Sequence, residues 1–324
     1  MMGDFWYDTS MQTHTPSEAP VAVLCGGVGA ARFLEGLVQV VAPAAISAII
    51  NTGDDIELHG LDISPDVDIV LCTLAGLIHP GQGWGIVDDT DHCHTMLARL
   101  GAEHWFMLGD KDLALHIQRT ALRKTGHTAT QIAQQFADAL GVAVRLLPMT
   151  HQTVQTYIAT PAGAVHFQHF LVRDRAKATI TGIDYRGIAD ADATDEVWQA
   201  LRSAQRICIA PSNPIVSVGT ILALPGMRDF FAKRTVPVVA VSPIVGGSAI
   251  KGPLVPMLIN AGYEVSPLGI AQWYAGLIDT LVIDTVDAVF APAIAALGIT
   301  PVVTNTIMRD LPAKAALAQT VMQA

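Results

Sequence analysis

Val21-Ala-Val-Leu-Cys-Gly-Gly-Val-Gly-Ala-Ala-Arg-Phe-Leu34 is the stretch that decides the fold. It begins with a short apolar run, Val21–Leu24, of the kind found in the strands of a buried parallel sheet. Three glycines follow, Gly26, Gly27 and Gly29, and apolar residues then recur at helical spacing. The order of strand, glycine turn and helix predicts a site where backbone N–H groups at a helix N-terminus bind a phosphate.

The glycine turn alone has a second interpretation. Arg32 stands where the dinucleotide-binding pattern G-x-G-x-x-G would have its third glycine. A tight strand-to-helix turn that binds no ligand would show the same residues. The rest of the chain must therefore decide between a phosphate loop and a plain turn.

The composition is that of a compact globular protein. Of the 324 residues 51% are hydrophobic and 15% are charged, so the chain can bury a large core. The net charge of −10 argues against nucleic acid or an anionic membrane as a partner. A phosphorylated ligand would therefore have to be neutralised locally, by backbone N–H groups, a metal ion or a few cations.

Two further features bear on location. Residues 1–20 contain no Lys or Arg and no apolar centre, so we expect a disordered tail and not a signal peptide. The four cysteines are widely spaced, which suits reduced thiols. We therefore expect a cytoplasmic protein.

Apolar runs that end in polar loops recur along the chain and alternate with helical patterns. This alternation predicts an α/β fold with a Rossmann-like, doubly wound, mostly parallel sheet. After the first run, the strand-like runs are Ala45–Ile50, Val142–Leu147, Arg206–Ala210, Val236–Val241, Leu281–Asp284 and Pro301–Val303.

The same patterns divide the chain. Residues 21–150 form the N-terminal part of the core, with a helical segment over Thr95–Leu140. Over residues 151–200 the apolar period changes to two, which predicts a β-rich insertion with a hairpin at Val154–Val172. Residues 201–324 form the C-terminal part of the core.

Carboxylates cluster after the second predicted strand. Asp54 and Asp55 follow a glycine at the strand's carboxyl end, where ligands bind in open α/β sheets and where carboxylate oxygens suit Mg²⁺. An ordinary turn is the alternative. Asp66 and Asp68 open a further strand-like run, Pro65–Cys72. On one side of an extended segment they would either complete a metal site or be solvated.

Three further loops contain residues that are suited to binding a ligand. Trp84 lies between two glycines and can offer a flat face to a planar ring, or it can pack inward. Loops rich in Gly, Ser, Asn and Pro follow the later strands at Pro211–Pro214 and Ser242–Gly247, and Lys251 comes soon after. Together they predict a polar floor at one edge of the sheet that can cradle a nucleotide.

These segments together resemble the 2-phospho-L-lactate transferase family. The matching motifs extend in order from Val21 to Asp284, and the sequence departs from the family's usual residues at Ala30, Ala31 and Val87–Asp89. The motifs are Cys25–Arg32, Asn51–Asp55, Ser64–Asp68, Gly83–Thr90, Trp105–Ala114, Leu146–Thr150, His166–Gln168, Pro211–Pro214 and Ser242–Gly247.

The resemblance implies a phosphotransferase of coenzyme F-420 biosynthesis. The terminal ribityl hydroxyl of the deazaflavin Fo would attack a phosphorus of a guanosine diphosphate-linked acid, and GMP would leave. The acid is 2-phospho-L-lactate or its enolpyruvyl or glyceryl analogue. Phosphoryl transfer of this kind needs positioning and charge neutralisation, and Mg²⁺ is the implied cofactor. We further expect a homodimer.

The resemblance also implies roles for single residues. The diphosphate would be held by Gly26, Gly27, Gly29 and Arg32. Asp54, with Asp55 or Asp68, would hold Mg²⁺, and a free carboxylate of the Asp54/Asp55 pair would steer or deprotonate the hydroxyl. Trp84 and Gly85 would contact the deazaflavin, with Asp88 nearby. The nucleotide side would be lined by Ser212, Asn213, Gly246, Gly247 and Lys251.

Two other functions fit parts of the sequence. An NAD(P)-binding enzyme could use an acid after the second strand to bind ribose, but the paired aspartates and the missing third glycine count against it. A nucleotide-sugar-binding regulator, as in the related gluconeogenesis-factor family, needs no catalysis. The segments Gly83–Gly85 and Gly109–Asp112 favour the transferase.

Overall fold

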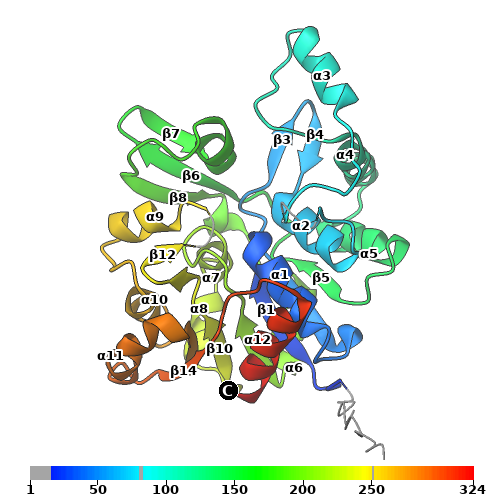
Figure 1. The fold of residues 1–324 in the computed structure, drawn as a ribbon. Helices are drawn as coiled ribbons and strands as arrows, with labels where there is room; N and C mark the ends of the chain where they lie inside the picture. The colour runs from blue at the N-terminus through cyan, green and yellow to red at the C-terminus, as the bar shows by residue number, and fades with distance from the viewer. Residues whose placement is uncertain (1–15, 80–82, 250–251) are drawn as a thin grey trace, which may run out of the picture.

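The structure of the chain is a computed structural model that describes residues 16–79, 83–249 and 252–324 (Figure 1). Its centre is a seven-stranded sheet in the order β14-β13-β10-β9-β1-β2-β5, with every neighbouring pair parallel. This confirms the predicted Rossmann-like α/β fold. The strands are β1 (Val21–Cys25), β2 (Ile46–Ile50), β5 (Arg145–Pro148), β9 (Arg206–Ile209), β10 (Val238–Val241), β13 (Thr280–Asp284) and β14 (Thr300–Thr304).

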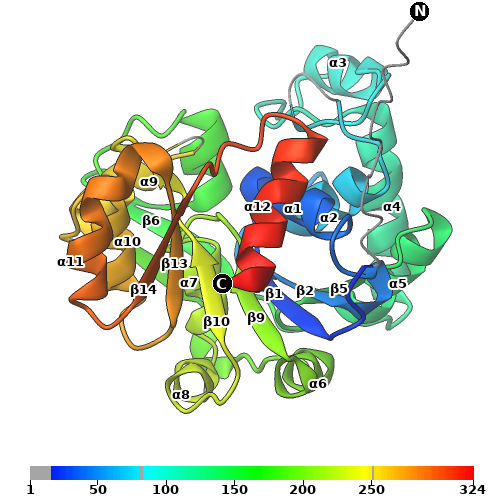
Figure 2. The same ribbon diagram turned by 60° about the horizontal axis from the view of Figure 1, so that its bottom comes forward.

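Helices cover both faces of the sheet (Figure 2). One face carries α1 (Gly27–Leu37), α2 (Pro65–Leu74), α5 (Ala129–Ala139) and α12 (Leu311–Gln323). The other face carries α6 (Asp195–Ser203), α7 (Val218–Leu222), α8 (Met227–Ala232), α9 (Leu254–Asn260), α10 (Pro267–Trp273) and α11 (Ala291–Ala295).

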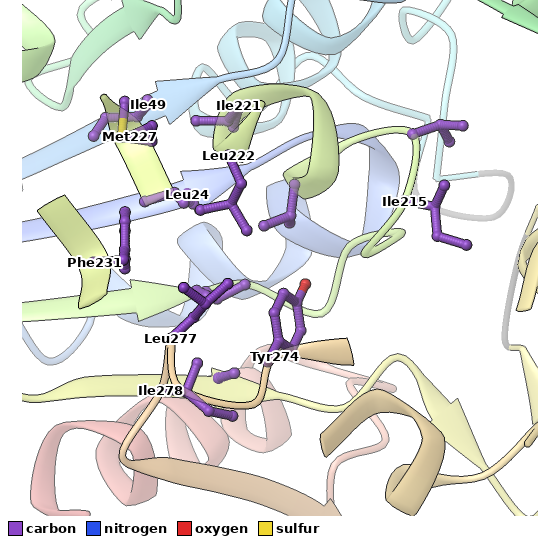
Figure 3. Packing of buried hydrophobic residues seen from close by; sticks show 14 of the residues in the cluster. Leu24, Ile49, Ile215, Ile221, Leu222, Met227, Phe231, Tyr274, Leu277 and Ile278 are labelled. Carbon is purple, nitrogen blue, oxygen red and sulfur yellow. The ribbon is translucent and has the colours of Figure 1, made fainter. Parts of the chain in front are cut away.

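Alternation along the buried strands builds two cores. In β1, Val23 and Cys25 face the α1 side, whereas Leu24 faces the α7 side. Figure 3 shows Leu24 beside Ile221 and Leu222 of α7. Because both faces of the sheet are covered, its strands read as continuous apolar runs, which is why the sequence revealed them.

The order of the strands reverses between β1 and β9, so this is the topological switch point of the sheet. A Cβ atom added to Gly29 would lie 2.3 Å from the carbonyl oxygen of Pro211, which follows β9. The Gly26 N–H donates to Ser212 Oγ at 3.3 Å. Glycine is therefore required here for the two halves of the sheet to meet, at the crevice where ligands bind in this class of fold.

Two excursions rise from the carboxyl edge of the sheet (Figure 1). The first, between β2 and β5, contains β3 (Ile56–Leu58), β4 (Leu61–Ile63), α2, α3 (His92–Arg99), α4 (Asp110–Lys124) and α5. The second is a separate antiparallel sheet, β7-β6-β8, made of β6 (Gln155–Thr160), β7 (Gly163–His166) and β8 (Gly182–Arg186). The predicted hairpin and its separation from the parallel sheet are confirmed, but its second strand ends at His166, and His169–Arg173 forms a π-helix where the prediction extended the strand to Val172.

The run Pro65–Cys72 was predicted as a strand, and this prediction is wrong, because it lies in the helix α2. Proline at the first helical position and acidic residues in the first turn are helix-start signals. The buried Val67, Val70 and Leu71 have helical spacing. Because residues two apart do not share a helix face, Asp66 and Asp68 point to different neighbours.

The remaining features concern the ends of the chain and its surface. Residues 1–15 of the predicted tail lie outside the described residues, and Ser17 pairs with Val41. Among the residues described, no helix is long and apolar enough to cross a membrane.

Gly29→Ala tests the contact at the switch point. We expect a loss of about 1–3 kcal/mol in the free energy of unfolding, because the added methyl group meets backbone that cannot move aside. Urea unfolding would measure it. Gly182→Ala is the matched control, since its Cβ would lie 3.6 Å from Ala159 Cβ, an ordinary contact. Equal stability of the two variants would contradict the proposed close packing.

Candidate active site

The loop after β2 forms the centre of the site, and hydrogen bonds from the start of α2 and from the β-rich insertion hold it. Asn51 Oδ1 accepts the Gly53 N–H at 2.8 Å, and Asn51 Nδ2 donates to Asp66 Oδ2 of α2 at 2.9 Å. From the β-rich insertion, the Thr156 N–H donates to the Gly53 carbonyl at 2.7 Å. The insertion is therefore bonded directly to the acidic loop, although the two are a hundred residues apart in sequence.

His166, at the end of β7, gives the loop a second support. Its Nδ1 accepts the Gln168 N–H at 3.2 Å, so the proton lies on Nε2, which donates to the Asp55 carbonyl oxygen at 3.2 Å. Burial lowers the pKa of His166 to about 4, so the ring is neutral at pH 7. His166 acts on Asp55 as a fixed hydrogen-bond donor and not as a charge.

Asp66 lies at the glycine turn, and its charge acts on the buried Asp54. Asp66 accepts the Gly27 N–H, and a Cβ atom on Gly26 would lie 2.5 Å from Asp66 Oδ2. Asp54 is 5% exposed. Burial raises the pKa of Asp54 well above its usual value, and the Asp66 charge raises it further. Burial also raises the pKa of Asp66 to about 6. The site is short of positive charge.

Asp55 and Asp68 lie on the other side of the loop, beside α4. Ser64 Oγ donates to Asp55 Oδ2 at 2.7 Å. Burial raises the pKa of Asp55 to about 8, although the Ser64 hydrogen bond and the Arg119 guanidinium oppose this. Asp68 forms an ion pair with the buried Arg119. Asp54 therefore feels mainly the charge of Asp66, whereas Asp55 feels the charges of both Asp68 and Asp66.

Unpaired oxygens mark this loop. In the described part of the chain six buried side-chain nitrogen or oxygen atoms lack a hydrogen-bond partner, and five belong to the acidic loop and its neighbours. They are Thr52 Oγ1, Asp54 Oδ1, Asp55 Oδ1, Asp68 Oδ2 and Thr156 Oγ1. Buried polar atoms without partners indicate an ion, a water or a ligand group.

The donor set suits a hard cation. Oxygen ligands are those that Mg²⁺ prefers, and Mg²⁺ usually takes only one or two carboxylates, with waters and substrate phosphates completing its shell. In residues 16–79, 83–249 and 252–324 no three Asp, Glu, His or Cys side chains form a ready cage. The residues therefore fit a Mg²⁺ that arrives with a phosphate ligand better than a permanently caged metal.

The predicted nucleotide loops lie at the same edge of the sheet. Asn213 Oδ1 accepts the N–H groups of Ile215 and Val216 at 2.9 and 3.2 Å, which fixes the loop after β9. Gly246 and Gly247 connect the short strands β11 (Ile244–Val245) and β12 (Ser248–Ala249) with left-handed backbone. Arg32 is partly exposed on α1. Lys251 lies outside the described residues.

Trp84 is presented to solvent. Its side chain is 54% exposed, and Gly83 and Gly85 on either side both have left-handed backbone. The Gly85 carbonyl accepts the His79 N–H at 2.9 Å, which closes the loop beneath the tryptophan. The alternative of an inward-packed Trp84 is wrong. Asp88, four residues later, is also exposed and left-handed.

Several residues that shape the site have no predicted role in the sequence analysis: Asn51, Arg119, Thr156, His166 and Asp287. Asp287 of the 3-10 helix Thr285–Phe290 is buried and accepts the Gly246 N–H at 3.0 and 3.2 Å. Helix-start signals at Pro65 would have oriented Asp66. The others act through contacts between distant segments, for which a single sequence contains no signal.

The chain is similar to known proteins in both sequence and fold. The family model for 2-phospho-L-lactate transferase CofD matches residues 21–306. The chain is 41% identical to a phosphoenolpyruvate transferase of Streptomyces coelicolor, covering 92% of this chain and 96% of that one. It is 36% identical to a 2-phospho-L-lactate transferase of Methanocaldococcus jannaschii, covering 94% and 97%. A Bacillus halodurans UPF0052 structure shares the fold, with a TM-score of 0.64 at 17% identity over 94% and 99% of the two chains.

His166→Leu tests the support of the acidic loop. We expect backbone amides of residues 51–56 to exchange hydrogen roughly threefold to tenfold faster, because one net hydrogen bond is lost. His166→Gln keeps a donor and should exchange more slowly than the leucine variant. His127→Leu, a change at an exposed histidine on another element, is the control. Unchanged exchange in His166→Leu would show that the hydrogen bond does not hold the loop.

Proposed function

The chain belongs to the 2-phospho-L-lactate transferase family, and on that premise we propose that it joins the deazaflavin Fo to a phospho-acid from a guanosine diphosphate donor and releases GMP. The family and its named relatives make the protein a transferase. The observation that carries the proposal is the group of unpaired carboxylate oxygens of Asp54, Asp55 and Asp68 around the loop that follows β2, close to the switch point of the sheet. A nucleoside diphosphate bound with Mg²⁺ would satisfy both features.

The donor's diphosphate lies on the glycine turn in this proposal. Gly26 is the N-cap of α1 and Gly27 its first residue, so the N–H groups of the first helical turn and the positive end of the helix dipole face the ligand. In the structure Asp66 accepts the Gly27 N–H, and the Asp66 charge acts on Asp54. Two carboxylates and a diphosphate repel one another unless a cation lies between them.

Mg²⁺ supplies that cation when it is bound. We propose Asp54 and Asp66 as its protein ligands, because their charges interact, Asp66 lies at the glycine turn and Asp54 Oδ1 is unpaired. Asp68, the ligand that the sequence suggested, is held in its ion pair with Arg119. The metal would neutralise charge on the diphosphate as the new phosphodiester forms.

The protein's own groups position the hydroxyl and remove its proton. A carboxylate of the Asp54/Asp55 pair is the proposed acceptor of the proton from the ribityl hydroxyl. Burial raises the pKa values of both groups, to about 8 for Asp55, and a pKa near the working pH suits a general base. His166 and Thr156 hold the loop from the insertion side, which keeps that carboxylate in place.

The half-exposed Trp84 is the proposed platform for Fo, because a planar and largely apolar ring system packs well on an aromatic face. The higher identity to relatives named phosphoenolpyruvate transferase favours the enolpyruvyl donor over the lactyl donor. Mass spectrometry of the product formed with each donor tests the proposal. Titration with Fo, GDP, NAD and a UDP-sugar separates it from a dehydrogenase or a nucleotide-sugar-binding regulator.

Asp54→Asn should abolish turnover with Mg²⁺ and leave the fold intact. Burial of the Asp54 charge is unfavourable, so its removal should not lower the melting temperature. Product formation and thermal unfolding, measured on one preparation, would test this. Asp192→Asn, at an exposed aspartate, is the control. Normal turnover by Asp54→Asn would show that the residue is wrongly assigned.

Trp84→Ala should weaken Fo binding roughly tenfold or more and leave GDP affinity nearly unchanged. Stacking of an aromatic ring on a planar ligand contributes about 1–3 kcal/mol. Fluorescence titration with Fo and calorimetry with GDP would measure the two affinities. If Trp84 only stabilises its loop, both affinities and the melting temperature should fall together.

A further inference from the structure

A groove lies at the opposite edge of the sheet from the proposed active site. It runs between α6 and α8, near the amino ends of β9 and β10, and has a volume of about 480 Å³. Figure 2 shows both helices on the same side of the sheet, away from α1 and α12. A volume of this size holds a small organic ligand.

The floor of the groove is apolar and aromatic. Trp198 and Phe230 meet edge to face with centroids 5.9 Å apart, one from each helix. Leu201 is fully buried beneath them, and Val236 is partly buried in the lining. Gly226 lies beside the indole of Trp198, because a Cβ atom built on it would be 3.8 Å from the ring. As a glycine it has no side chain that could cover this ring. Part of the aromatic surface is thus left open to a flat ligand.

The rim of the groove is cationic. Arg234 already has partners within the protein, because it donates to the Phe231 carbonyl at 2.6 Å and forms an ion pair with Asp279 at 2.7 Å. Arg202 and Lys233 are exposed, and neither takes part in an ion pair within the described ranges.

The positive charges are therefore not neutralised by the protein itself. Among the residues that line the groove only Asp229 is acidic. The Arg202 guanidinium lies 5.5 Å from the centroid of the Trp198 ring, where a cation and an aromatic face attract. In a chain of net charge −10, two unpaired cations beside an open aromatic surface form a local site for an anion.

We infer that this groove is a second ligand site, which binds a small organic anion that combines a flat apolar ring with one acidic group. The ring packs on Phe230 and Trp198, and the acidic group accepts hydrogen bonds from Arg202 and Lys233. The site is separate from the proposed transfer reaction. The groove lies at the amino ends of β9 and β10, whereas the reaction site lies at the carboxyl ends of the parallel strands.

A matched pair of fluorescent probes tests this inference. 8-Anilinonaphthalene-1-sulfonate carries the ring and the acid, whereas N-phenyl-1-naphthylamine carries nearly the same ring without the acid. We expect Arg202→Gln/Lys233→Gln to weaken binding of the sulfonate about tenfold and to leave binding of the neutral probe unchanged. Both residues are exposed, so the double variant should keep the native melting temperature.

The controls separate this site from others. Lys124→Gln/Lys177→Gln changes the net charge equally at exposed lysines outside the groove and should bind the sulfonate normally. Saturating GDP with Mg²⁺ should not displace the sulfonate. The inference is overturned if the two double variants bind the sulfonate equally, if the groove variant weakens both probes alike, or if GDP competes. A failure of transfer activity would not affect these results.

Discussion

The close approach of the two halves of the sheet at Gly26 and Gly29 is the constraint on which the site depends. A side chain at Gly29 would meet the Pro211 carbonyl of the loop after β9, and a side chain at Gly26 would meet Asp66 of α2 and Ser217, the residue before α7. This packing fixes the switch point, where parallel strands end and helix N-termini gather. The same packing is a sufficient structural reason for two of the three glycines, so the glycines alone do not prove a phosphate site.

The buried carboxylates do not stabilise the fold and therefore indicate a ligand site. Asp54, Asp55 and Asp66 are held by Asn51, Ser64 and backbone groups, yet oxygens of Asp54 and Asp55 have no partner in the described chain. Burying several carboxylates together is unfavourable, and it persists only where the surrounding structure enforces it. The insertion does so here, through Thr156 and His166. A divalent cation would offset part of the charge of these carboxylates and of a bound diphosphate, which is the charge neutralisation that phosphoryl transfer requires.

Local patterns in the sequence predicted most of the fold. The apolar runs of β1, β2, β9, β10 and β13 were visible because each strand is covered on both faces, and the hairpin was visible because β6 has a period of two. The prediction failed at α2 because a short apolar run suits a buried strand and a buried helix alike, and only Pro65 and Asp66 at its start indicate the helix. The partners of Asp54 and Asp55 could not be predicted, since α2, α4 and the insertion meet only in the fold. The sequence could not decide the direction of Trp84 either, because the backbone of its flanking glycines sets it.

The most direct test of this account is a crystal structure with GDP and Mn²⁺, in which anomalous scattering locates the metal. The account predicts a metal bound by Asp54 Oδ1 and a phosphate oxygen, with the diphosphate on the N–H groups that open α1. It also predicts that the Gly27 N–H exchanges its bond to Asp66 for one to the phosphate. His116 of α4 has its Nδ1 3.6 Å from Asp68 Oδ2. A metal bound by Asp68 and His116, or a nucleotide away from the glycine turn, would contradict the account.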